Sequence, residues 1–420
     1  MPSREHEIEA IVRRVSANAV TRRKFLAATG FTSLAAFIAA CSGGASSAAP
    51  SAAAPSVAPS AAPPSVAPSV EPSASASAAV AEPSYATEGA LLMYNWADYI
   101  NQKNIDAFKA KYDITDFPYD TYASNEELMT RLQGGATGLY DICSPTCEFV
   151  PAMVDQSFID KLDFSRIPNW NYINPQFKKF FDPAGPQAKY NDYYMAKDWG
   201  TTGIALRRKY VKDDVTSWKQ FFEVAPKYKG QIVVVKSAGD VMTAPLKALG
   251  YSLNSVDPTE LNAARELLKG LAPNVLLLDS DHYEDSLRTG DAVLGLTWTG
   301  GLDELKAEKD TEDIEYIIPS DGTLYWLDVW TLLSGAPHPE AAYAWLNFIQ
   351  DPPIQGDETN VNYYATANDE AKKFVDPAIL ADPTVFVPDE VIPKLEGAAD
   401  VSTNPLRVEI WEEFVSSIGG

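Results

Sequence analysis

Two segments that lie far apart in this chain place a tryptophan beside an aspartate. Trp96 and Asp98 lie two positions apart in the sequence Asn-Trp-Ala-Asp-Tyr, and Trp326 and Asp328 repeat that spacing in Trp-Leu-Asp. A third tryptophan, Trp298, follows an apolar run. A carboxylate neutralises an organic ammonium, and an aromatic face attracts the same cation and packs against its methylene groups. If these segments converge, they form a site for an apolar cation with amine ends.

Short apolar runs alternate with amphipathic segments from about residue 90 onward, which is typical of an α/β fold. We expect strands over residues 91–94, 140–143, 231–235, 274–278 and 292–296. We expect helices over 105–112, 124–132, 241–249, 258–271 and 404–417, the second of which opens with a capping box. Ligands of open α/β sheets bind beyond the carboxyl ends of strands, and five cation candidates follow predicted strands: Trp96, Thr146, Ser237, Asp240 and Trp298.

The first forty residues have the pattern of an export signal. Arg22 and Arg23 form a twin-arginine motif, the apolar run 25–40 is too short to span a bilayer, and Cys41 follows it as in a lipobox. We expect a signal peptide over 1–40 and lipidation of Cys41, which would attach the protein to a membrane outside the cytoplasm. A chance arginine pair, or a secretory peptide cleaved at another position, is the alternative.

Residues 41–87 consist mainly of Ala, Ser, Pro and Val. Such a stretch buries too little apolar surface to offset the entropy of ordering it, so we expect a disordered tether. Its prolines favour extended polyproline II, and at roughly 3 Å per residue it would reach on the order of 100 Å.

Charge and cysteine usage exclude several classes of function. The formal net charge of −23 argues against nucleic acid and against an anionic membrane surface as direct partners. Cys143 and Cys147 form either a disulfide or two packed thiols. No Cys/His cluster has the spacing of a metal site, so we expect no metal and no cofactor, and we interpret His282 and His338 as solvated loop residues.

From residue 90 to the last helix, the chain resembles the periplasmic spermidine/putrescine-binding proteins of ABC transporters, a branch of the type II solute-binding proteins. The resemblance rests on motifs in the family's order: Asn-Trp-Ala-Asp-Tyr at 95–99, Ser-Asn-Glu at 124–126, Tyr-Asp-Ile at 140–142, Trp-Gly-Thr-Thr-Gly at 199–203, Gly-Leu-Thr-Trp at 295–298 and Trp-Leu-Asp at 326–328. It implies two α/β lobes joined by crossover strands near 199–206 and 325–332, with the ligand trapped between them. The implied lobes are 88–203 with 329–372, and 204–328 with 373–420.

The resemblance also implies roles for single residues. On the first lobe, Trp96 and Tyr99 correspond to aromatic walls, Asp98 to an acid that meets an amine, and Thr146 to a hydroxyl. On the second lobe, Asp240 corresponds to a carboxylate for an amine, Trp298 and Trp326 to aromatic walls, and Asp328 to the central carboxylate. Tyr364 corresponds to a further aromatic residue. The chain departs from the family at Glu148, where spermidine binders have a tyrosine, at Ser237, where they have an aspartate, and at Gly301, which replaces an acid of the putrescine type.

The sequence therefore predicts a monomeric, lipid-anchored substrate-binding protein of an ABC importer, which hands a polyamine to the permease and performs no chemistry. One alternative is a binding protein for another small cation, such as an opine, a thiamine-like compound or a betaine. Another is an exported hydrolase that uses paired carboxylates such as Asp98 and Asp328, although the chain has no Gly-x-Ser-x-Gly elbow. A scaffold with a vestigial pocket is the third.

Overall fold

The computed structural model describes residues 83–418 apart from 182, 307 and 400. The predicted signal peptide, Cys41 and all but the last residues of the predicted tether lie outside these residues. Those last residues contact the folded part, since the hydroxyl of Tyr85 donates to the carbonyl of Arg166 at 2.5 Å and Thr87 donates to Tyr112 at 2.9 Å. Among the described residues, no helix combines the length and apolar character needed to cross a membrane.

The larger of the two sheets, here called the first sheet, has eight strands, and these include the first and the last strand of the described residues. Its path runs β12-β5-β11-β3-β1-β2, with β4 and β13 also paired to β11. β1 is parallel to β2 and β3, whereas β11 is antiparallel to β3, β4 and β5. The strands are β1 Met93–Trp96, β2 Tyr119–Tyr122, β3 Ile142–Cys143, β4 Ile159–Asp160, β5 Met195–Thr201, β11 Thr323–Leu333, β12 Ala365–Thr366 and β13 Leu395–Gly397.

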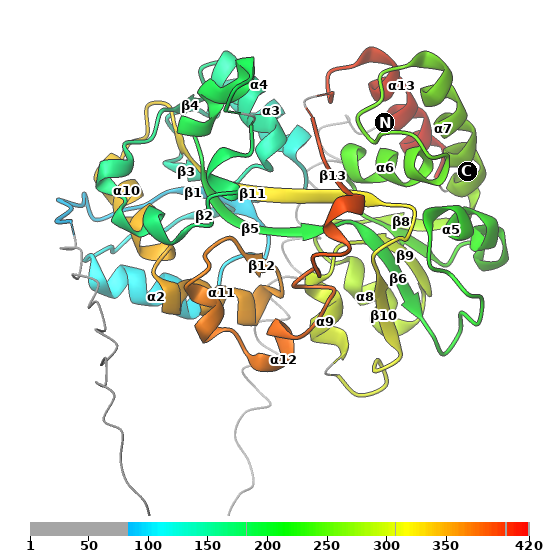
Figure 1. The fold of residues 1–420 in the computed structure, drawn as a ribbon. Coiled ribbons are helices and arrows are strands. Elements are labelled where there is room, and N and C mark those ends of the chain that lie inside the picture. The colour runs from blue at the N-terminus through cyan, green and yellow to red at the C-terminus, as the bar shows by residue number, and fades with distance from the viewer. Residues whose placement is uncertain (1–82, 182, 307, 400, 419–420) are drawn as a thin grey trace, which may run out of the picture. The chain divides into compact units, whose positions relative to one another are not determined.

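The second sheet has five strands in the order β10-β6-β9-β7-β8. β7 is parallel to β8 and β9, and β6 is antiparallel to β9 and β10. The strands are β6 Gly203–Arg207, β7 Ile232–Val234, β8 Val275–Leu278, β9 Leu294–Thr297 and β10 Ile314–Ile317. The chain passes from the first sheet to the second between β5 and β6, and it returns between β10 and β11. Figure 1 shows β5 and β11 running side by side between the two groups of elements.

Helices cover both sheets. The α-helices are α2 Gln102–Lys111, α3 Asn125–Arg131, α4 Val150–Asp155, α5 Trp218–Val224, α6 Ala238–Ala248, α7 Pro258–Leu271, α8 Tyr283–Thr289, α9 Gly300–Lys306, α10 Pro339–Ile349, α11 Pro352–Asn362, α12 Pro377–Leu380 and α13 Pro405–Ser417. Shorter helical turns are Leu132–Ala136, Cys147–Phe149, Phe164–Arg166, Pro168–Tyr172, Phe177–Lys179, Pro186–Asp192, Ala225–Tyr228, Ala272–Asn274, Ala371–Phe374 and Ile392–Lys394. The predicted bounds of α7 are those observed, because Asp257 caps its first turn and Pro258 fits the first helical position.

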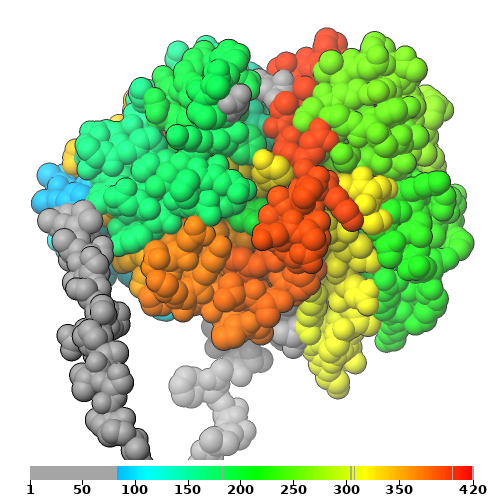
Figure 2. Space-filling view, in the orientation of Figure 1, coloured from blue at the N-terminus to red at the C-terminus, as the bar shows by residue number. Residues whose placement is uncertain are grey.

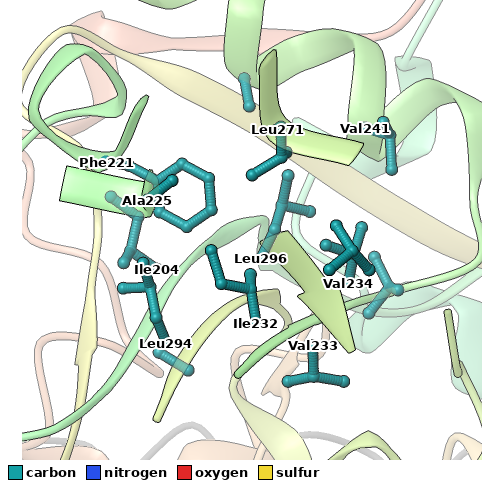
Figure 3. Close-up of a cluster of buried hydrophobic side chains, with 14 of the residues drawn as sticks. Ile204, Phe221, Ala225, Ile232, Val233, Val234, Val241, Leu271, Leu294 and Leu296 are labelled. Atoms are coloured by element: carbon teal, nitrogen blue, oxygen red, sulfur yellow. The ribbon is translucent and has the colours of Figure 1, made fainter. Parts of the chain in front are cut away.

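The core of the second sheet comes from its apolar strands. Ile232, Val233 and Val234 of β7 and Leu294 and Leu296 of β9 are fully buried. Figure 3 shows these side chains together with four others from elements that pack on the sheet. They are Phe221 of α5, Ala225 of the turn after α5, Val241 of α6 and Leu271 of α7. Runs of β-branched and aliphatic residues form strands here because both faces of a partly parallel sheet are covered by helices.

Two residue interpretations change with the structure. Cys143 and Cys147 are free, buried thiols, so the disulfide alternative is wrong. His338 is not a solvated loop residue, because its Nδ1 lies 3.0 Å from an oxygen of the fully buried Asp141, and its backbone N–H donates to the same carboxylate at 2.6 Å. The pair fixes the start of α10 against the first sheet. His282, by contrast, is exposed.

Candidate functional site

All eleven predicted ligand residues line one cavity of about 650 Å³. Both sheets contribute to it, together with residues between α11 and β12 and at the start of α13. The predicted members are Trp96, Asp98, Tyr99, Thr146, Glu148, Ser237, Asp240, Trp298, Trp326, Asp328 and Tyr364. The structure therefore brings together side chains that are up to 268 positions apart, although their role as ligand contacts remains a prediction.

Strand ends position most of these side chains. Trp96 is the last residue of β1, and Trp298 directly follows β9. Ser237 and Asp240 lie at the start of α6, the helix that follows β7. Trp326 and Asp328 are two positions apart on β11, so they point to the same face of that strand. Asp98 differs from the rest because it is exposed and has a positive φ of 49°.

Aromatic rings from both sheets meet in the cavity. Trp96 and Trp298 are in edge contact with ring centroids 6.3 Å apart. Tyr364 contacts Trp326 at 4.9 Å and Tyr99 at 5.9 Å. Close packing requires glycine at Gly200, since a Cβ there would lie 2.4 Å from a ring carbon of Trp326. The rings thus form continuous walls of the kind that attract a cation.

Asp240 is the buried carboxylate of the second sheet. It is 7% exposed and accepts hydrogen bonds from the indole N–H of Trp298 at 3.0 Å and from the hydroxyl of Thr202. Burial raises its pKa, and the bonds from Ser237, Thr202 and Trp298 oppose that rise. The carboxylate is therefore held in place by neutral donors, and no basic residue is among these partners.

Asp328 is the corresponding carboxylate on β11. It is 7% exposed, and its partners are the hydroxyls of Tyr99, at 2.6 Å, and Thr146. Thr146 is itself fixed by Asn125, whose side chain makes bonds of 2.8 and 3.0 Å to its hydroxyl and its backbone N–H. Burial and the neighbouring charge of Asp198 raise the pKa of Asp328 to about 7.

A buried ion pair beneath this carboxylate was not predicted. Lys197 and Asp198 on β5 form a salt bridge, and both are almost fully buried. The Lys197 ammonium also lies 3.3 Å from the centre of the Tyr99 ring. Asp198 accepts from the Tyr99 hydroxyl at 2.5 Å and from the Asn362 amide at 3.1 Å. The sequence signal that could have indicated this ion pair is the adjacent Lys197 and Asp198 within the otherwise mostly apolar segment that forms β5.

The described residues that line the cavity are strongly acidic. Eight of them are carboxylates, namely Asp98, Glu126, Glu148, Asp240, Asp281, Glu284, Asp328 and Glu412. Glu148 is half-buried, and burial together with the charges of Asp328, Asp240 and Glu126 raises its pKa well above the usual range. Acid pKa values that rise through mutual repulsion are lowered again when a cation binds among them.

The one basic residue among the described lining residues is Arg407 of α13. It is 7% exposed and donates to the carbonyls of Leu253 and Ser255 at 3.0 and 2.9 Å, and burial lowers its pKa to about 10. The segment before α13 contributes further lining residues, namely Ala398, Ala399, Val401 and Ser402. Figure 2 shows the red-orange C-terminal part of the chain between the blue-green part on the left and the light-green and yellow part on the right.

β13, in the same part of the chain, is tied to both sheets. Its residues pair with the beginning of β11, and Glu396 forms a salt bridge of 2.8 Å with Lys247 of α6. Within residues 83–418 and outside the three gaps, no group of His, Cys, Asp and Glu side chains could hold a metal ion.

The structure has two β-sheets covered by helices and joined by the paired strands β5 and β11, and residues from both parts line one acidic cavity. This arrangement is that of a solute-binding protein. Residues 103–387 match the family of bacterial extracellular solute-binding proteins. The spermidine/putrescine-binding periplasmic protein of Escherichia coli K12 is 30% identical over 330 residues, which is 78% of this chain and 91% of that protein. The chain thus belongs to the extracellular solute-binding proteins, in the spermidine/putrescine-binding branch of that family.

Solved structures agree with this assignment. A candidate spermidine/putrescine ABC transporter protein from Listeria monocytogenes is 30% identical with a TM-score of 0.71, and the match covers 78% of this chain and 99% of that one. A lipoprotein of Treponema pallidum is 25% identical with a TM-score of 0.66, covering 78% of this chain and 98% of that one. The two-lobe α/β fold expected from the sequence is confirmed, and the relatives are binding proteins and not enzymes.

Proposed function

We propose that this protein captures a polyamine of the putrescine or spermidine type outside the cytoplasm and delivers it to the permease of an ABC importer. The observation that carries the proposal is the excess of carboxylates in a cavity walled by aromatic rings. Protonated amines neutralise the carboxylates, and the methylene chain between them packs on the rings. The names of the relatives in Escherichia coli and Listeria monocytogenes support the same ligand class.

The affinity expected from these contacts is moderate. Each charge-assisted hydrogen bond to a buried ammonium contributes about 1.5–3 kcal/mol, and each aromatic contact about 0.5–2 kcal/mol. Ordering a flexible diamine and removing its water oppose these terms. A net of about −8 kcal/mol corresponds to a dissociation constant on the order of micromolar.

The lobes of this binding protein are proposed to be 88–203 with 329–372, and 204–328 with 373–420. Contacts such as that between Trp96 and Trp298 would then join the two lobes across the ligand. Closure by rotation about β5 and β11 is the expected motion, since hinges are formed by the few segments that connect two rigid bodies.

A lipid anchor on Cys41 and the Ala/Ser/Pro-rich segment after it would keep a monomeric protein at the membrane. The relative in Treponema pallidum is described as a lipoprotein, which supports this part of the proposal. Replacing Cys41 with Ser should shift the protein from the membrane fraction to the soluble extracytoplasmic fraction. Retention of the variant in the membrane fraction would rule the anchor out.

The ligand is tested by calorimetric titration of the purified protein with putrescine, spermidine, spermine and glycine betaine. We expect binding of at least one polyamine in the micromolar range or tighter, and none of the betaine, because a quaternary ammonium cannot donate a hydrogen bond to Asp240 or Asp328. Binding of the betaine alone, or of none of the four, would contradict the proposal. The Asp328→Asn variant, which keeps the size of the side chain, should bind at least tenfold more weakly.

A further inference from the structure

A single hydroxyl lies between two carboxyl groups in the cavity wall. The Tyr99 oxygen is 2.5 Å from Asp198 and 2.6 Å from Asp328, and both distances are those of short hydrogen bonds. A phenol carries one proton and can donate only one hydrogen bond. The second contact therefore needs a second proton, which one of the two carboxyl groups must hold.

The neighbours of the two groups identify which one holds that proton. Asp198 faces the Lys197 ammonium and the Asn362 amide, both of which stabilise its ionised form. Among the described residues, the side-chain hydrogen-bond partners of Asp328 are the neutral hydroxyls of Tyr99 and Thr146. The order of donation is then from Asp328 to Tyr99 and from Tyr99 to Asp198, with Asp198 ionised and Asp328 neutral.

The register of β5 and β11 is a second reason why Asp328 and Asp198 should not both be ionised. Asp198 of β5 and Asp328 of β11 are partners in the antiparallel ladder. Two like charges directly opposite each other on neighbouring strands are destabilising, so a neutral Asp328 relieves the repulsion.

Other titratable groups face Asp328 from every side. The acids are Asp198 on β5, Glu148 on the turn after Thr146, and, through Glu148, Asp240 on α6 and Glu126 on α3. Lys197 is the one cation among the groups that act on Asp328. Tyr122, Cys147 and Tyr364 face it as neutral groups, because burial raises the pKa of each well above its ordinary value. Most of these neighbours disfavour a charge on Asp328 in the empty cavity.

We propose that ligand capture is coupled to the release of a proton from Asp328, and that Lys197 and Asp198 are positioning residues that set this coupling through Tyr99. The inference rests on the proposed cationic ligand. When an ammonium of the ligand reaches Asp328, the O–H bond of the neutral carboxyl breaks and the proton passes to solvent. The ionised carboxylate then accepts a hydrogen bond from the ammonium, and Tyr99 remains hydrogen-bonded to Asp198. One cation enters and up to one proton leaves.

The neutral carboxyl can be observed without any ligand. We expect the carboxyl carbon of Asp328 in the ligand-free protein to titrate near neutral pH by ¹³C NMR, with the signal assigned by its absence in the Asp328→Asn variant. Titration below pH 5, the range of an ordinary aspartate, would overturn the proposal whatever the ligand proves to be.

Proton release is measured by calorimetry of polyamine binding in buffers of different ionisation enthalpy. We expect close to one proton per ligand at pH 6 and close to none at pH 8.5, with the dissociation constant falling up to about tenfold per pH unit between pH 5 and 7. A release that is zero at pH 6, or equal at both pH values, would overturn the coupling. Absence of binding by every polyamine would instead refute the proposed function, and the NMR titration would still decide the state of Asp328.

The role of the ion pair is tested with the double variant Lys197→Met/Asp198→Asn, which removes both charges without leaving either buried alone. Asp198 raises the pKa of Asp328 more than Lys197 lowers it. The double variant should therefore shift the midpoint of proton release to lower pH, while thermal unfolding confirms that the protein is folded. A midpoint identical to that of the unaltered protein would overturn the positioning role.

Discussion

Trp96 ends β1 of the first sheet and Trp298 directly follows β9 of the second, and their rings meet edge to face with centroids 6.3 Å apart. Trp96 donates its indole N–H to the carbonyl of Ser144 at 2.9 Å, and Trp298 donates its own to Asp240 at 3.0 Å. Ser144 follows β3 of the first sheet and Asp240 lies on α6, which packs with the second sheet, so the contact between the rings depends on the relative position of these two groups of elements. A cation that fills the space beside both rings would stabilise the same arrangement.

Truncation of either tryptophan should weaken binding of the cation. For Trp96→Ala we expect a loss of about 0.5–2 kcal/mol, or roughly two- to thirty-fold in the dissociation constant, because a desolvated ring contact is removed. Tyr210→Ala is the matched control, since Tyr210 is 46% exposed and does not line the cavity. Equal affinities of the two variants in calorimetry would place the ligand elsewhere.

Asp240→Asn should separate affinity from stability. The amide oxygen can still accept from Thr202 and Trp298, so these two bonds are kept while the charge is lost. We expect binding to weaken about ten- to a hundred-fold. The melting temperature of the ligand-free protein should stay the same or rise, because burial disfavours the charged carboxyl and raises its pKa. A fall in both quantities would mean that Asp240 is a structural residue.

Glu148→Gln tests the position at which the chain departs from its relatives. Burial and the charges of three neighbouring acids hold the pKa of Glu148 well above its usual range. If Glu148 meets an ammonium, the variant should lose affinity for the polyamine that binds best and change the order of preference among putrescine, spermidine and spermine. Uniform affinities in the variant and the unaltered protein would exclude Glu148 from the ligand contacts.

The contribution of Asp328 to the stability of the ligand-free protein should decrease as the pH rises from about 4 to about 7. The pKa of Asp328 is raised to about 7 in the folded state, so between its ordinary pKa and that value the folded state binds more protons than the unfolded state. This contribution is complete below the ordinary pKa and is lost as the pH rises through about 7. Urea denaturation of Asp328→Asn should show a smaller decrease.

Asp257→Asn provides the control for that pH series. Asp257 caps α7, and bonds from the backbone of Glu260 and Thr259 lower its pKa, so it is ionised in both states above pH 5. The variant should lose stability by a constant amount between pH 5 and 8. If Asp328→Asn behaved in the same way, the raised pKa of Asp328 would be wrong.

Gly200→Ala should disturb the site through Trp326. The added methyl group would lie 2.4 Å from the Trp326 ring, so the ring must move away from its position against Tyr364. We expect a loss of stability of more than 1 kcal/mol, as for overpacking in a core, and weaker binding. Gly270→Ala on α7 meets no atom within 4 Å and should stabilise the helix by about 0.5–1 kcal/mol. Thermal unfolding should therefore shift in opposite directions for the two variants.

The sequence predicted the parts of the fold whose signals are local. The bounds of α7 followed from a capping residue and a proline, and the strand β7 from a run of valines. The eleven residues assigned to the site through spacing and resemblance all line one cavity, together with other residues that were not predicted. These features depend on neighbours in sequence or on motifs that the whole family shares.

Other features depend on contacts between distant segments, and periodicity carries no information about them. Lys197 would be expected on a surface, but Tyr99, Asp198 and Trp330 surround it in the interior. His338 was interpreted as solvated because Asp141, its partner, lies 197 positions away. Arg407 lines the cavity because its guanidinium donates to the carbonyls of Leu253 and Ser255, in the segment after α6. Partners of this kind become visible only in three dimensions.

The unpaired thiols of Cys143 and Cys147 bear on where this domain is able to fold. Both are fully buried, and their pKa values are raised by burial, so neither is a nucleophile that oxidants reach easily. No cross-link among the described residues depends on an oxidising compartment. The described part of the chain should reach the same structure in a reducing cytoplasm and in an oxidising extracellular space, and its production in either setting should need no disulfide-forming machinery.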